Sequence, residues 1–494
     1  MTRRLLLAFL ICSPLAALDP ARDVLLSWPE ADPRAAPLAR EIGAAAIFVP
    51  FSVGAAAEFL QACRDAAVQP VAEIRTVTDA DSLRRQTEAA LSAGFTALAY
   101  DAWSDEAEVR RFASQRPQTL QFVFLKRDEV GWNVAPAHAV LVEGLWPGIK
   151  PTDPSTASAT GPPWLDSNAW LYVWLRARFP DRPALLGYRP NEAAGVPKDR
   201  MLREYTVELA LIEAIASGGN VVLSLPDRYR TALLAGESRA REAWQALART
   251  SALLREHSMR FQPAPGLRVL ALVGSLDESG EVLNMLFRNN ATPAVAAADR
   301  MPPLDPKRHP VLVAANIPLF AADQERILGF VKAGGTVLAA PDLEAGELWW
   351  RDRAGERIRE DDERTFHALG RGQFIGYRGF VIDVYEFAFD VLQALHWRAR
   401  DLRLWNADTV IGFLRRHDGG RLSLQLIDYG TRWRRDHDPD FLVQIHGSYP
   451  KAVLETPELA APINLDVRLR EGLTEFEMRD LRHFATIQLE AGKQ

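Results

Sequence analysis

Two carboxylic acids stand at the ends of short apolar runs in the first half of the chain. Asp101 follows Ala97–Tyr100, and Glu143 follows Ala139–Val142. A charge at the end of a buried run is costly unless it has a role. Glycoside hydrolysis needs two carboxyl groups that flank an acetal, one protonated and one ionised. The pair therefore indicates glycosidase chemistry, with Asp101 and Glu143 as the candidate catalytic residues.

Each of the two carboxylates also has an ordinary structural interpretation. Aspartate is a favoured helix N-cap, so Asp101 could cap the helix that follows it. Glu143 could instead form an ion pair with Arg75 or Arg189. The sequence leaves these alternatives open.

Further polar and aromatic residues lie near the expected ends of other strands. Indole rings suit the apolar faces of sugars, and their N–H groups suit hydroxyls, although core packing is the alternative for each tryptophan. Glu73 could be a buried partner of Arg75 or bind a hydroxyl, and Asp227 could be a turn residue or bind substrate. The candidate substrate-binding residues are Trp28, Glu73, Arg75, Trp103, Trp146, Tyr188, Arg189 and Asp227.

The elements that must position these residues alternate between strand and helix. Gly94 and Gly218-Gly219 stand where a helix end needs a left-handed residue before the next strand. Such alternation predicts parallel strands with helices outside, and eight units match a (β/α)8 barrel, with catalytic groups at the carboxyl ends of its strands. An open doubly wound sheet is the alternative. The eight predicted strands are Val24–Trp28, Ala46–Phe51, Pro70–Arg75, Ala97–Asp101, Gln121–Leu125, Ala139–Glu143, Ala184–Tyr188 and Asn220–Leu225.

The second half of the chain changes pattern twice. Buried strands and helices alternate again after Pro263–Gly266, for example in the helix Ala321–Lys332, and predict a flavodoxin-like α/β domain. Strict polar–apolar alternation, as in Arg421–Ile427 and Thr474–Met478, then predicts an antiparallel β-sandwich. The α/β fold class is therefore divided into a barrel at 18–262, the middle domain at 263–402 and the sandwich at 403–494.

The first residues read as an export signal. Met1–Arg4 carries two arginines, Leu5–Ile11 is apolar, and Ala16 and Ala17 are small. This order is typical of a secretory signal peptide, here 1–17, and the run is too short for a membrane span. A buried N-terminal helix is the alternative. The signal predicts a periplasmic or extracellular location in a bacterium and no integral membrane span after its removal.

Composition narrows the function classes. The chain has 494 residues, a formal net charge of −6 and 25% charged residues, so it reads as a multidomain globular protein without a basic surface for nucleic acid. No CxxC or HExxH spacing occurs, and we expect neither a metal nor a cofactor. Of its two cysteines, Cys63 lies in an apolar helical stretch and is expected to be an inert core thiol.

The second half resembles parts of known carbohydrate-active enzymes. The segment Pro310–Leu319, followed by Gln324–Leu338, is similar to the trimerisation domain of bacterial β-galactosidases, which is glutamine-amidotransferase-like. An active amidotransferase has a cysteine after the central strand, where this chain has Ala314-Ala315-Asn316. The resemblance implies a structural or oligomerising domain and a possible homo-oligomer. Gln425–Gly430 resembles a strand of the C-terminal domain of many glycoside hydrolases.

The barrel departs from those β-galactosidases, which carry Asn-Glu after strand four and Glu after strand seven. Its segment Gly94–Asp101 is instead similar to the "Gly-Phe-Asp-Gly, two apolar residues, Asp" motif of endo-α-1,4-polygalactosaminidase-like hydrolases. That resemblance implies Asp101 as nucleophile or stabiliser and Glu143 as acid/base. The hypothesis is a secreted glycoside hydrolase acting on a poly- or oligosaccharide. The alternative is a catalytically inactive carbohydrate-binding barrel or an envelope scaffold.

Overall fold

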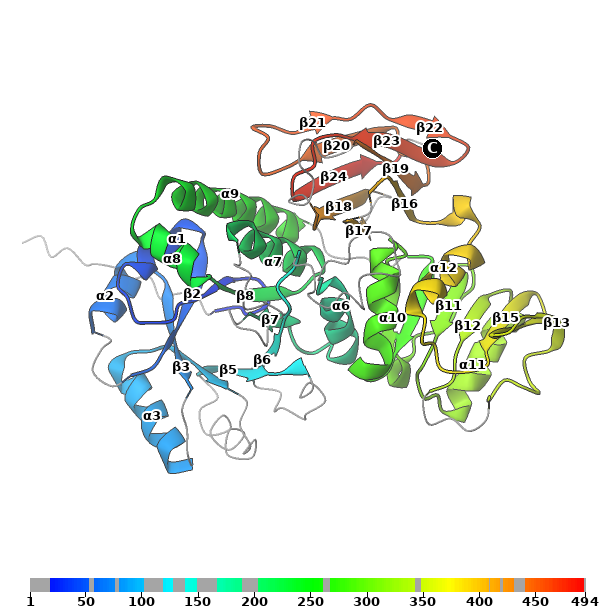
Figure 1. The fold of residues 1–494 in the computed structure, drawn as a ribbon, viewed down its shortest axis with the longest axis horizontal. Helices are drawn as coiled ribbons and strands as arrows, with labels where there is room; N and C mark the ends of the chain where they lie inside the picture. Colours follow the sequence, from blue (N-terminus) through cyan, green and yellow to red (C-terminus); the bar gives the residue numbers. More distant parts are fainter. Residues whose placement is uncertain are drawn as a thin grey trace, which may run out of the picture.

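The computed structural model has three parts. The barrel and the middle domain lie side by side, and the C-terminal sandwich lies over their junction (Figure 1). The structure describes residues 18–52, 57–75, 80–101, 119–127, 138–148, 167–188, 203–260, 267–342, 348–407, 409–417, 421–430 and 440–492.

The first part is a closed barrel of eight parallel strands, as the sequence predicts. Strand β1 pairs with β2 on one side and with β8 on the other, which closes the ring. The strands are β1 (Val24–Ser27), β2 (Ala44–Pro50), β3 (Gln69–Ile74), β4 (Ala97–Asp101), β5 (Leu120–Leu125), β6 (His138–Glu143), β7 (Leu185–Gly187) and β8 (Asn220–Ser224). The helices around them are α1 (Ala35–Glu41), α2 (Ala57–Ala66), α3 (Ala80–Ala93), α6 (Ala169–Arg178), α7 (Glu204–Ala216), α8 (Asp227–Leu234) and α9 (Ser238–Arg260).

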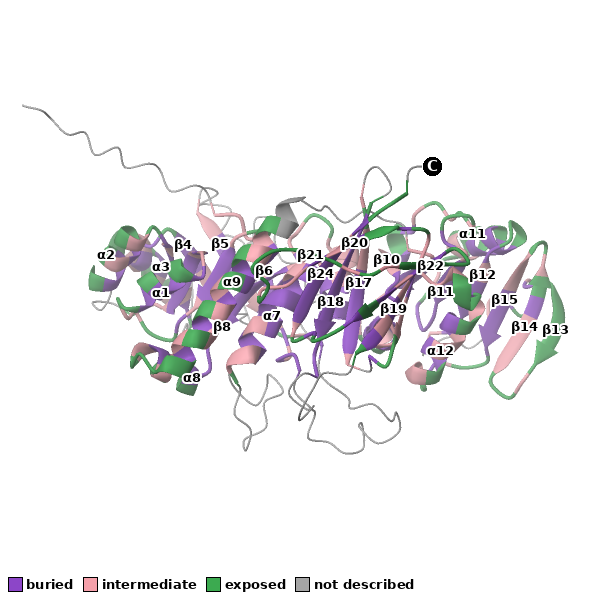
Figure 2. Ribbon diagram, turned by 90° about the horizontal axis from the view of Figure 1, so that it is seen from above, coloured by how far each residue is buried: buried purple, intermediate pink, exposed green. Residues whose placement is uncertain are grey.

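Alternate side chains of each barrel strand face opposite sides. Residues such as Leu25, Phe48 and Leu141 form the small core inside the barrel. Their neighbours along the strands, such as Leu26, pack outward against the helices in a larger core. Figure 2 shows the buried strands inside helices whose outer faces are exposed. This period-two alternation decides which strand residues can reach the barrel mouth.

Glycines end two barrel helices where the sequence predicts them. Gly94 has φ 109° after α3, and Gly218 has φ 78° after α7. Residues with a Cβ atom rarely adopt this left-handed region. Each glycine therefore turns the chain sharply from a helix into the next strand.

The middle part is an α/β sheet with the strand order β10-β9-β11-β12-β15-β14-β13. Five strands are parallel, and β14 and β13 extend the sheet in the antiparallel sense. The sequence analysis did not predict this antiparallel hairpin of β13 and β14 at the edge of the sheet. The elements are β9 (Val269–Val273), α10 (Leu276–Arg288), β10 (Ala294–Ala297), β11 (Val311–Ala314), α11 (Ala321–Lys332), β12 (Thr336–Ala339), β13 (Glu356–Glu360), β14 (Arg364–Leu369), β15 (Gly372–Tyr377) and α12 (Val384–Ala394), with 3-10 turns at Ala298–Arg300 and Trp397–Ala399.

Asn316 occupies the elbow after β11 in the left-handed region, with φ 62°. Its buried side chain accepts a hydrogen bond from the Val381 backbone N–H at 2.8 Å and donates to the Val381 carbonyl at 3.2 Å. The amide thus ties the loops after β11 and β15 together. This elbow carries a structural residue and no nucleophile.

The last part is a sandwich of two antiparallel sheets, with the orders β16-β19-β23-β22 and β17-β18-β24-β20-β21. Leu424, Val443 and Phe476 belong to the core between the sheets. The strands are β16 (Leu402–Trp405), β17 (Val410–Arg416), β18 (Leu422–Asp428), β19 (Phe441–His446), β20 (Lys451–Glu455), β21 (Ile463–Asn464), β22 (Arg468–Arg470), β23 (Leu473–Met478) and β24 (Phe484–Glu490).

One hydrophobic core runs through the junction of the three parts. The indole of Trp170 on α6 lies so close to α10 that a Cβ atom at Gly280 would be 3.0 Å from the ring. Trp174 donates its indole N–H to the Gly274 carbonyl at 3.2 Å, and the rings of Phe287 and Phe413 lie 5.9 Å apart. The parts therefore pack on one another through apolar surface.

The signal peptide and the core thiol Cys63 were both predicted in the first part of the chain, and the structure describes the residues of only the second prediction. The predicted signal peptide, 1–17, lies outside the described residues. Cys63 is a free, buried thiol, and burial raises its pKa to about 12, so it is an inert core thiol at neutral pH. Within the described ranges, no helix is both long and apolar enough to cross a membrane.

Two glycine substitutions are expected to have opposite effects on stability. A Cβ atom at Gly219 would lie 2.3 Å from Tyr172 Cδ1 and 2.7 Å from the Ala184 carbonyl oxygen, so Gly219→Ala should destabilise the fold by about 1–3 kcal/mol. Gly329, exposed on α11, has open space around it, so Gly329→Ala should stabilise by up to about 1 kcal/mol. Thermal unfolding of both variants checks this. A Gly219→Ala protein as stable as the parent would contradict the packing at the end of α7.

Candidate active site

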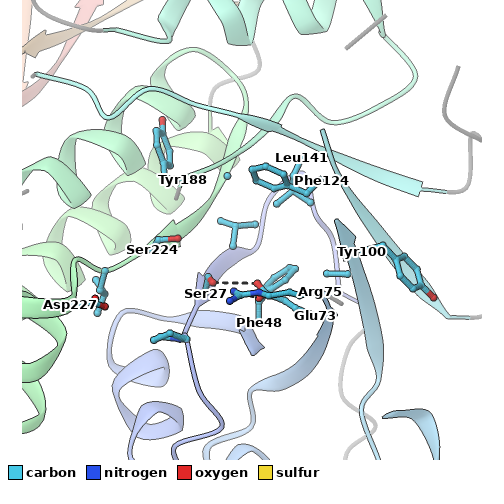
Figure 3. A pocket seen from close by; sticks show the side chains of 15 residues that line it. Ser27, Phe48, Glu73, Arg75, Tyr100, Phe124, Leu141, Tyr188, Ser224 and Asp227 are labelled. Atoms are coloured by element: carbon cyan, nitrogen blue, oxygen red, sulfur yellow. Dashed lines mark hydrogen bonds and ion pairs between the residues drawn. The ribbon is translucent and has the colours of Figure 1, made fainter. Parts of the chain in front are cut away.

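A cavity of about 390 Å³ opens at the carboxyl ends of the barrel strands (Figure 3). Phe48, Phe124 and Leu141 form apolar walls, and Ser27, Glu73 and Ser224 add polar groups. Strands from opposite sides of the ring thus contribute to one concave site. A concave, largely apolar space with a few convergent polar groups is the usual form of a small-molecule site. The residues lining the cavity are Ser27, Pro29, Phe48, Glu73, Arg75, Ala99, Tyr100, Phe124, Leu141, Gly187, Tyr188, Val222, Ser224, Leu225 and Asp227.

Glu73 is a carboxylate in the wall of this cavity. It comes from the inward side of β3, and its side chain is 16% exposed. One carboxylate oxygen accepts a hydrogen bond from Ser27 Oγ at 3.3 Å, and the other pairs with the Arg75 guanidinium (Figure 3). The structure confirms the pairing of Glu73 with Arg75. It also leaves this carboxylate positioned beside any ligand in the cavity.

The two candidate catalytic residues end strands β4 and β6. Ala99 and Leu141 line the cavity, and Asp101 and Glu143 each follow two residues later in their strands. Strand alternation places Glu143 on the same inward side as Leu141. Glu143 is half-buried and is not itself part of the lining. The backbone of Asp101 belongs to β4, but its side chain lies outside the described residues. Asp101 pairs with Phe124 of β5, and Phe124 pairs with Leu141 of β6, so Glu143 lies two strand spacings across and two residues along from Asp101. The two backbone positions are therefore about 12 Å apart.

The other predicted substrate-binding residues fall into two groups. Trp28 and Trp146 are 0% and 1% exposed in the core outside the barrel, so neither presents a ring face to the cavity. Asp227 is exposed at the cavity rim, where it begins α8 and pairs with Arg230 at 3.2 Å. Trp103 and Arg189 lie outside the described residues. The structure therefore supports Glu73, Arg75 and Asp227 as cavity residues and gives the two tryptophans a packing role.

Sequence reasoning missed a buried carboxylate beside the site, Glu213 on α7. It is 0% exposed and accepts hydrogen bonds from neutral donors. Four reach Oε1, from Ser167 Oγ at 2.9 Å, Asn168 N at 2.5 Å, Ala169 N at 3.0 Å and Tyr429 OH at 2.8 Å. The Asn168 side-chain amide donates to Oε2 at 3.0 Å. Burial raises the pKa of Glu213, and these hydrogen bonds oppose the rise. The available signal was a glutamate inside the otherwise apolar stretch Leu209–Ala216.

Asn168 extends this network to the barrel mouth. Its amide donates to the Leu145 carbonyl at 2.7 Å and to Tyr188 OH at 3.2 Å, and its oxygen accepts from the Leu145 N–H at 2.9 Å. Arg127 donates to that same oxygen at 3.0 Å and to the Glu143 carbonyl at 3.0 Å. The backbone at the end of β6 is therefore fixed by side chains that Glu213 holds in place.

Tyr188 shows what this network does to the cavity. Its ring lies 4.8 Å from that of Trp146, and the side chain is 3% exposed. Burial raises its pKa well above the ordinary value, so the phenol stays neutral. Its hydrogen bond to Asn168 engages the hydroxyl, so Tyr188 forms a rigid part of the cavity wall. This packing role differs from the substrate-binding role that the sequence suggested.

The described residues also bear on whether the site could hold a metal ion. In the part of the chain that the structure describes, no three His, Cys, Asp or Glu side chains gather closely enough to hold a metal ion. Glu73 instead has an arginine as its partner. The chemistry that the described groups offer is that of carboxylates, hydroxyls and a guanidinium.

Comparisons with known proteins identify the fold. No family model matches the chain, and no curated protein sequence is similar to it. Among solved structures, α-L-fucosidase isoenzyme 2 from Paenibacillus thiaminolyticus matches with a TM-score of 0.57 and 11% identity, covering 96% of this chain and 100% of that one. Exo-β-1,4-mannosidase Op5Man5 from Opitutaceae bacterium strain TAV5 matches with a TM-score of 0.47 and 12% identity, covering 75% of this chain and 94% of that one.

The fucosidase match has a consequence for the domain layout. Because it covers nearly all of both chains, the shared fold extends over the barrel and the parts that follow it. This chain therefore has a glycoside-hydrolase-like (β/α)8 fold, as the sequence predicted. At this level of identity the likeness concerns the fold alone.

The raised pKa of Glu213 predicts a specific pH dependence. Between the unfolded pKa, near 4.5, and the higher folded pKa, the native state holds a proton that the unfolded state has released. The contribution of Glu213 to stability is therefore fully present below the unfolded pKa and is lost as pH rises through the folded value. Glu213→Gln has no such proton, and its amide N–H₂ would face the Asn168 amide. We expect this variant to be destabilised, and the deficit to shrink as pH rises.

Thermal unfolding of the parent and of Glu213→Gln from about pH 4 to about pH 8 measures this difference directly. Tyr429→Phe removes only one donor and provides a second test of the network. Its expected cost is about 1–3 kcal/mol, because a hydrogen bond to a buried charged group is lost. A deficit of Glu213→Gln that grows with pH would show that the donors outweigh burial and lower the pKa of Glu213.

Proposed function

We propose that this chain is a glycoside hydrolase that cleaves a poly- or oligosaccharide at the mouth of its barrel. The observation that carries the proposal is the cavity at the carboxyl ends of the strands, which has Glu73 in its wall and the Asp101 and Glu143 positions just beyond its lining. Active sites of such barrels lie at this end. The glycoside-hydrolase-like fold supports the same reaction class.

Asp101 and Glu143 would divide the chemistry between them. Their backbone separation of about 12 Å lets side chains that converge on the barrel axis reach the 5–10 Å carboxyl spacing used by glycosidases. Glu143 would protonate the glycosidic oxygen as the acid/base. Asp101 would act as nucleophile or stabilise the positive charge that develops on the sugar ring. The fixed backbone at the end of β6 would help to keep the acid in place, since Arg127 holds the Glu143 carbonyl.

The described cavity residues would bind the sugar without reacting with it. Glu73 accepts hydrogen bonds from ligand hydroxyls while it pairs with Arg75, and Ser27 and Ser224 offer hydroxyl groups. Phe48 and Phe124 present apolar surface to the sugar ring. A space of about 390 Å³ accommodates a small number of sugar units. Export by the N-terminal segment would deliver the enzyme to a periplasmic or extracellular polysaccharide.

A panel of polysaccharides and aryl glycosides, assayed for released sugar or phenol, tests the proposal. Asp101→Asn and Glu143→Gln should each lower kcat by about 10²–10⁴ on whichever substrate is cleaved, because acid–base and nucleophilic groups contribute that much. Glu242→Gln, an exposed carboxylate on α9, is the matched control and should leave activity unchanged. Turnover that survives both Asp101→Asn and Glu143→Gln would overturn the assignment.

Glu73 has a different expected signature. Glu73→Gln keeps the shape but loses the charge paired with Arg75, so substrate binding should suffer more than the chemical step. We expect KM to rise about tenfold, which corresponds to about 1.4 kcal/mol, with a smaller change in kcat. A large loss of kcat with KM unchanged would instead show that Glu73 takes part in the chemical step. Saccharide binding without turnover anywhere in the panel would favour the inactive carbohydrate-binding barrel.

A further inference from the structure

The outer face of one sandwich sheet carries an ordered row of polar and aromatic side chains. In the sheet β16-β19-β23-β22, the inward residues, such as Val443 and Phe476, fill the sandwich core. The outward residues include Arg403, Gln444 and Glu475 at matching positions of three neighbouring strands. These strands lie at the C-terminal end of the chain, away from the barrel (Figure 1). The row is therefore separate from the barrel mouth.

Trp405 is the aromatic member of this face, and its orientation is fixed. Its side chain is 40% exposed, and its indole N–H donates to Gln444 Oε1 at 2.7 Å. The Gln444 amide then donates to Glu475 Oε1 at 2.6 Å. The Arg403 guanidinium lies 3.5 Å from the ring centroid and covers one face. A large indole is thus held in one orientation while much of it remains exposed to solvent, which lowers the entropy cost of binding a ligand.

A large cavity continues from this face. It has a volume of about 930 Å³ and shares Leu442 and Glu475 with the outward residues of the sheet. Leu459, in the connection between β20 and β21, and Ile463, in β21, are 36% and 44% exposed and contribute apolar surface. Its charged lining is mixed, with the acidic residues Glu458, Asp466, Glu475, Glu477 and Asp480 and the basic residues Arg468, Arg479 and Arg482.

The charges and the side-chain shapes on this surface are suited to one chemical class of ligand. The excess of carboxylates disfavours anionic polymers such as nucleic acids and polyuronates. Carboxylates and guanidinium groups together accept from and donate to hydroxyls. An oriented indole suits the apolar face of a pyranose ring. A neutral saccharide combines these requirements, with many hydroxyls, no charge and flat apolar faces.

We propose that the outer face of this sheet, centred on Trp405 and extending into the adjoining cavity, is a binding surface for a neutral oligo- or polysaccharide. It is independent of catalysis at the barrel mouth. The saccharide stacks on the exposed part of the indole, and its hydroxyls bond to Gln444, Glu475 and Arg403. The surface would hold the protein on a polymer whether or not the barrel cleaves that polymer.

Affinity electrophoresis of the full chain in gels containing single polysaccharides tests the proposal. The neutral probes are galactomannan, xyloglucan, mixed-linkage β-glucan and amylopectin, and the anionic probes are polygalacturonate and heparin. All proteins carry Asp101→Asn, so hydrolysis does not destroy the probe. We expect at least one neutral polymer to retard the chain and Trp405→Ala to weaken the association constant about tenfold or more. Gln444→Ala, which keeps the ring but frees it, should weaken binding less.

Trp397→Ala is the matched control. Trp397 is 42% exposed and also has an arginine over its ring, Arg398 at 4.9 Å, but it lies on a 3-10 turn outside the sheet. Retardation lost in Trp405→Ala and kept in Trp397→Ala supports the proposal, provided that both variants melt like the parent. No retardation by any neutral polymer, stronger retardation by an anionic one, or retardation that Trp405→Ala leaves unchanged overturns it. Retardation that Glu73→Gln abolishes and Trp405→Ala does not would place saccharide binding at the barrel mouth instead.

Discussion

A single buried carboxylate, Glu213, sets the arrangement of the parts around the barrel mouth. A carboxylate without a partner in the protein interior costs several kcal/mol, so its surroundings must supply donors. They come from the start of α6, with Ser167, Asn168 and Ala169, and from Tyr429 of the sandwich. None of these donors can move far without leaving the carboxylate unsatisfied. The requirement therefore fixes α6, α7 and the sandwich relative to one another.

Helix α7 can carry this group because it is covered on several sides. Most of its residues are buried, and it packs against α9, β8 and the sandwich strand β18. Its C-terminal carbonyls are also satisfied from outside, since the Arg415 guanidinium of β17 donates to the carbonyls of Ile215 and Ala216. Burial lowers the pKa of Arg415 to about 10. Polar groups at the middle and the end of one helix thus join the barrel to the sandwich, while apolar packing of α6 on α10 joins it to the middle domain.

This arrangement has a consequence for the site. Arg127 donates to the Glu143 carbonyl and to the Asn168 side chain, and Asn168 donates to the Tyr188 hydroxyl. Glu213 in turn holds Asn168 in place. Protein side chains that are already held in place lose little conformational entropy when a ligand binds to them. Glu73 and Arg75 form a charged pair in the lining of the same cavity. The sandwich therefore contributes to the barrel mouth without touching the cavity, and its outer face remains available for a second role.

Features that depend on local periodicity could be predicted from the order of residues along the chain. Alternating strands and helices gave the closed barrel, the left-handed positions of Gly94 and Gly218 followed from helix ends, and α11 was predicted at Ala321–Lys332, where it lies. Asp101 and Glu143 stand at strand ends as expected, because strand ends show in the chain as ends of apolar runs. The lack of a nucleophile at the elbow with Asn316 could also be predicted, because it depends only on which residue stands at that position.

Which side chains meet depends on how the elements pack in three dimensions. Trp28 lies one residue beyond the inward-facing Ser27, and because strand residues alternate sides, that step turns it into the outer core. The role of Glu213 could not be predicted from local spacing, since its partners Asn168 and Tyr429 are 45 and 216 residues away. The edge hairpin of β13 and β14 and the row around Trp405 likewise depend on pairings between strands. Local order follows from the spacing of residues along the chain, whereas contacts between distant segments depend on how the packed elements satisfy their buried groups.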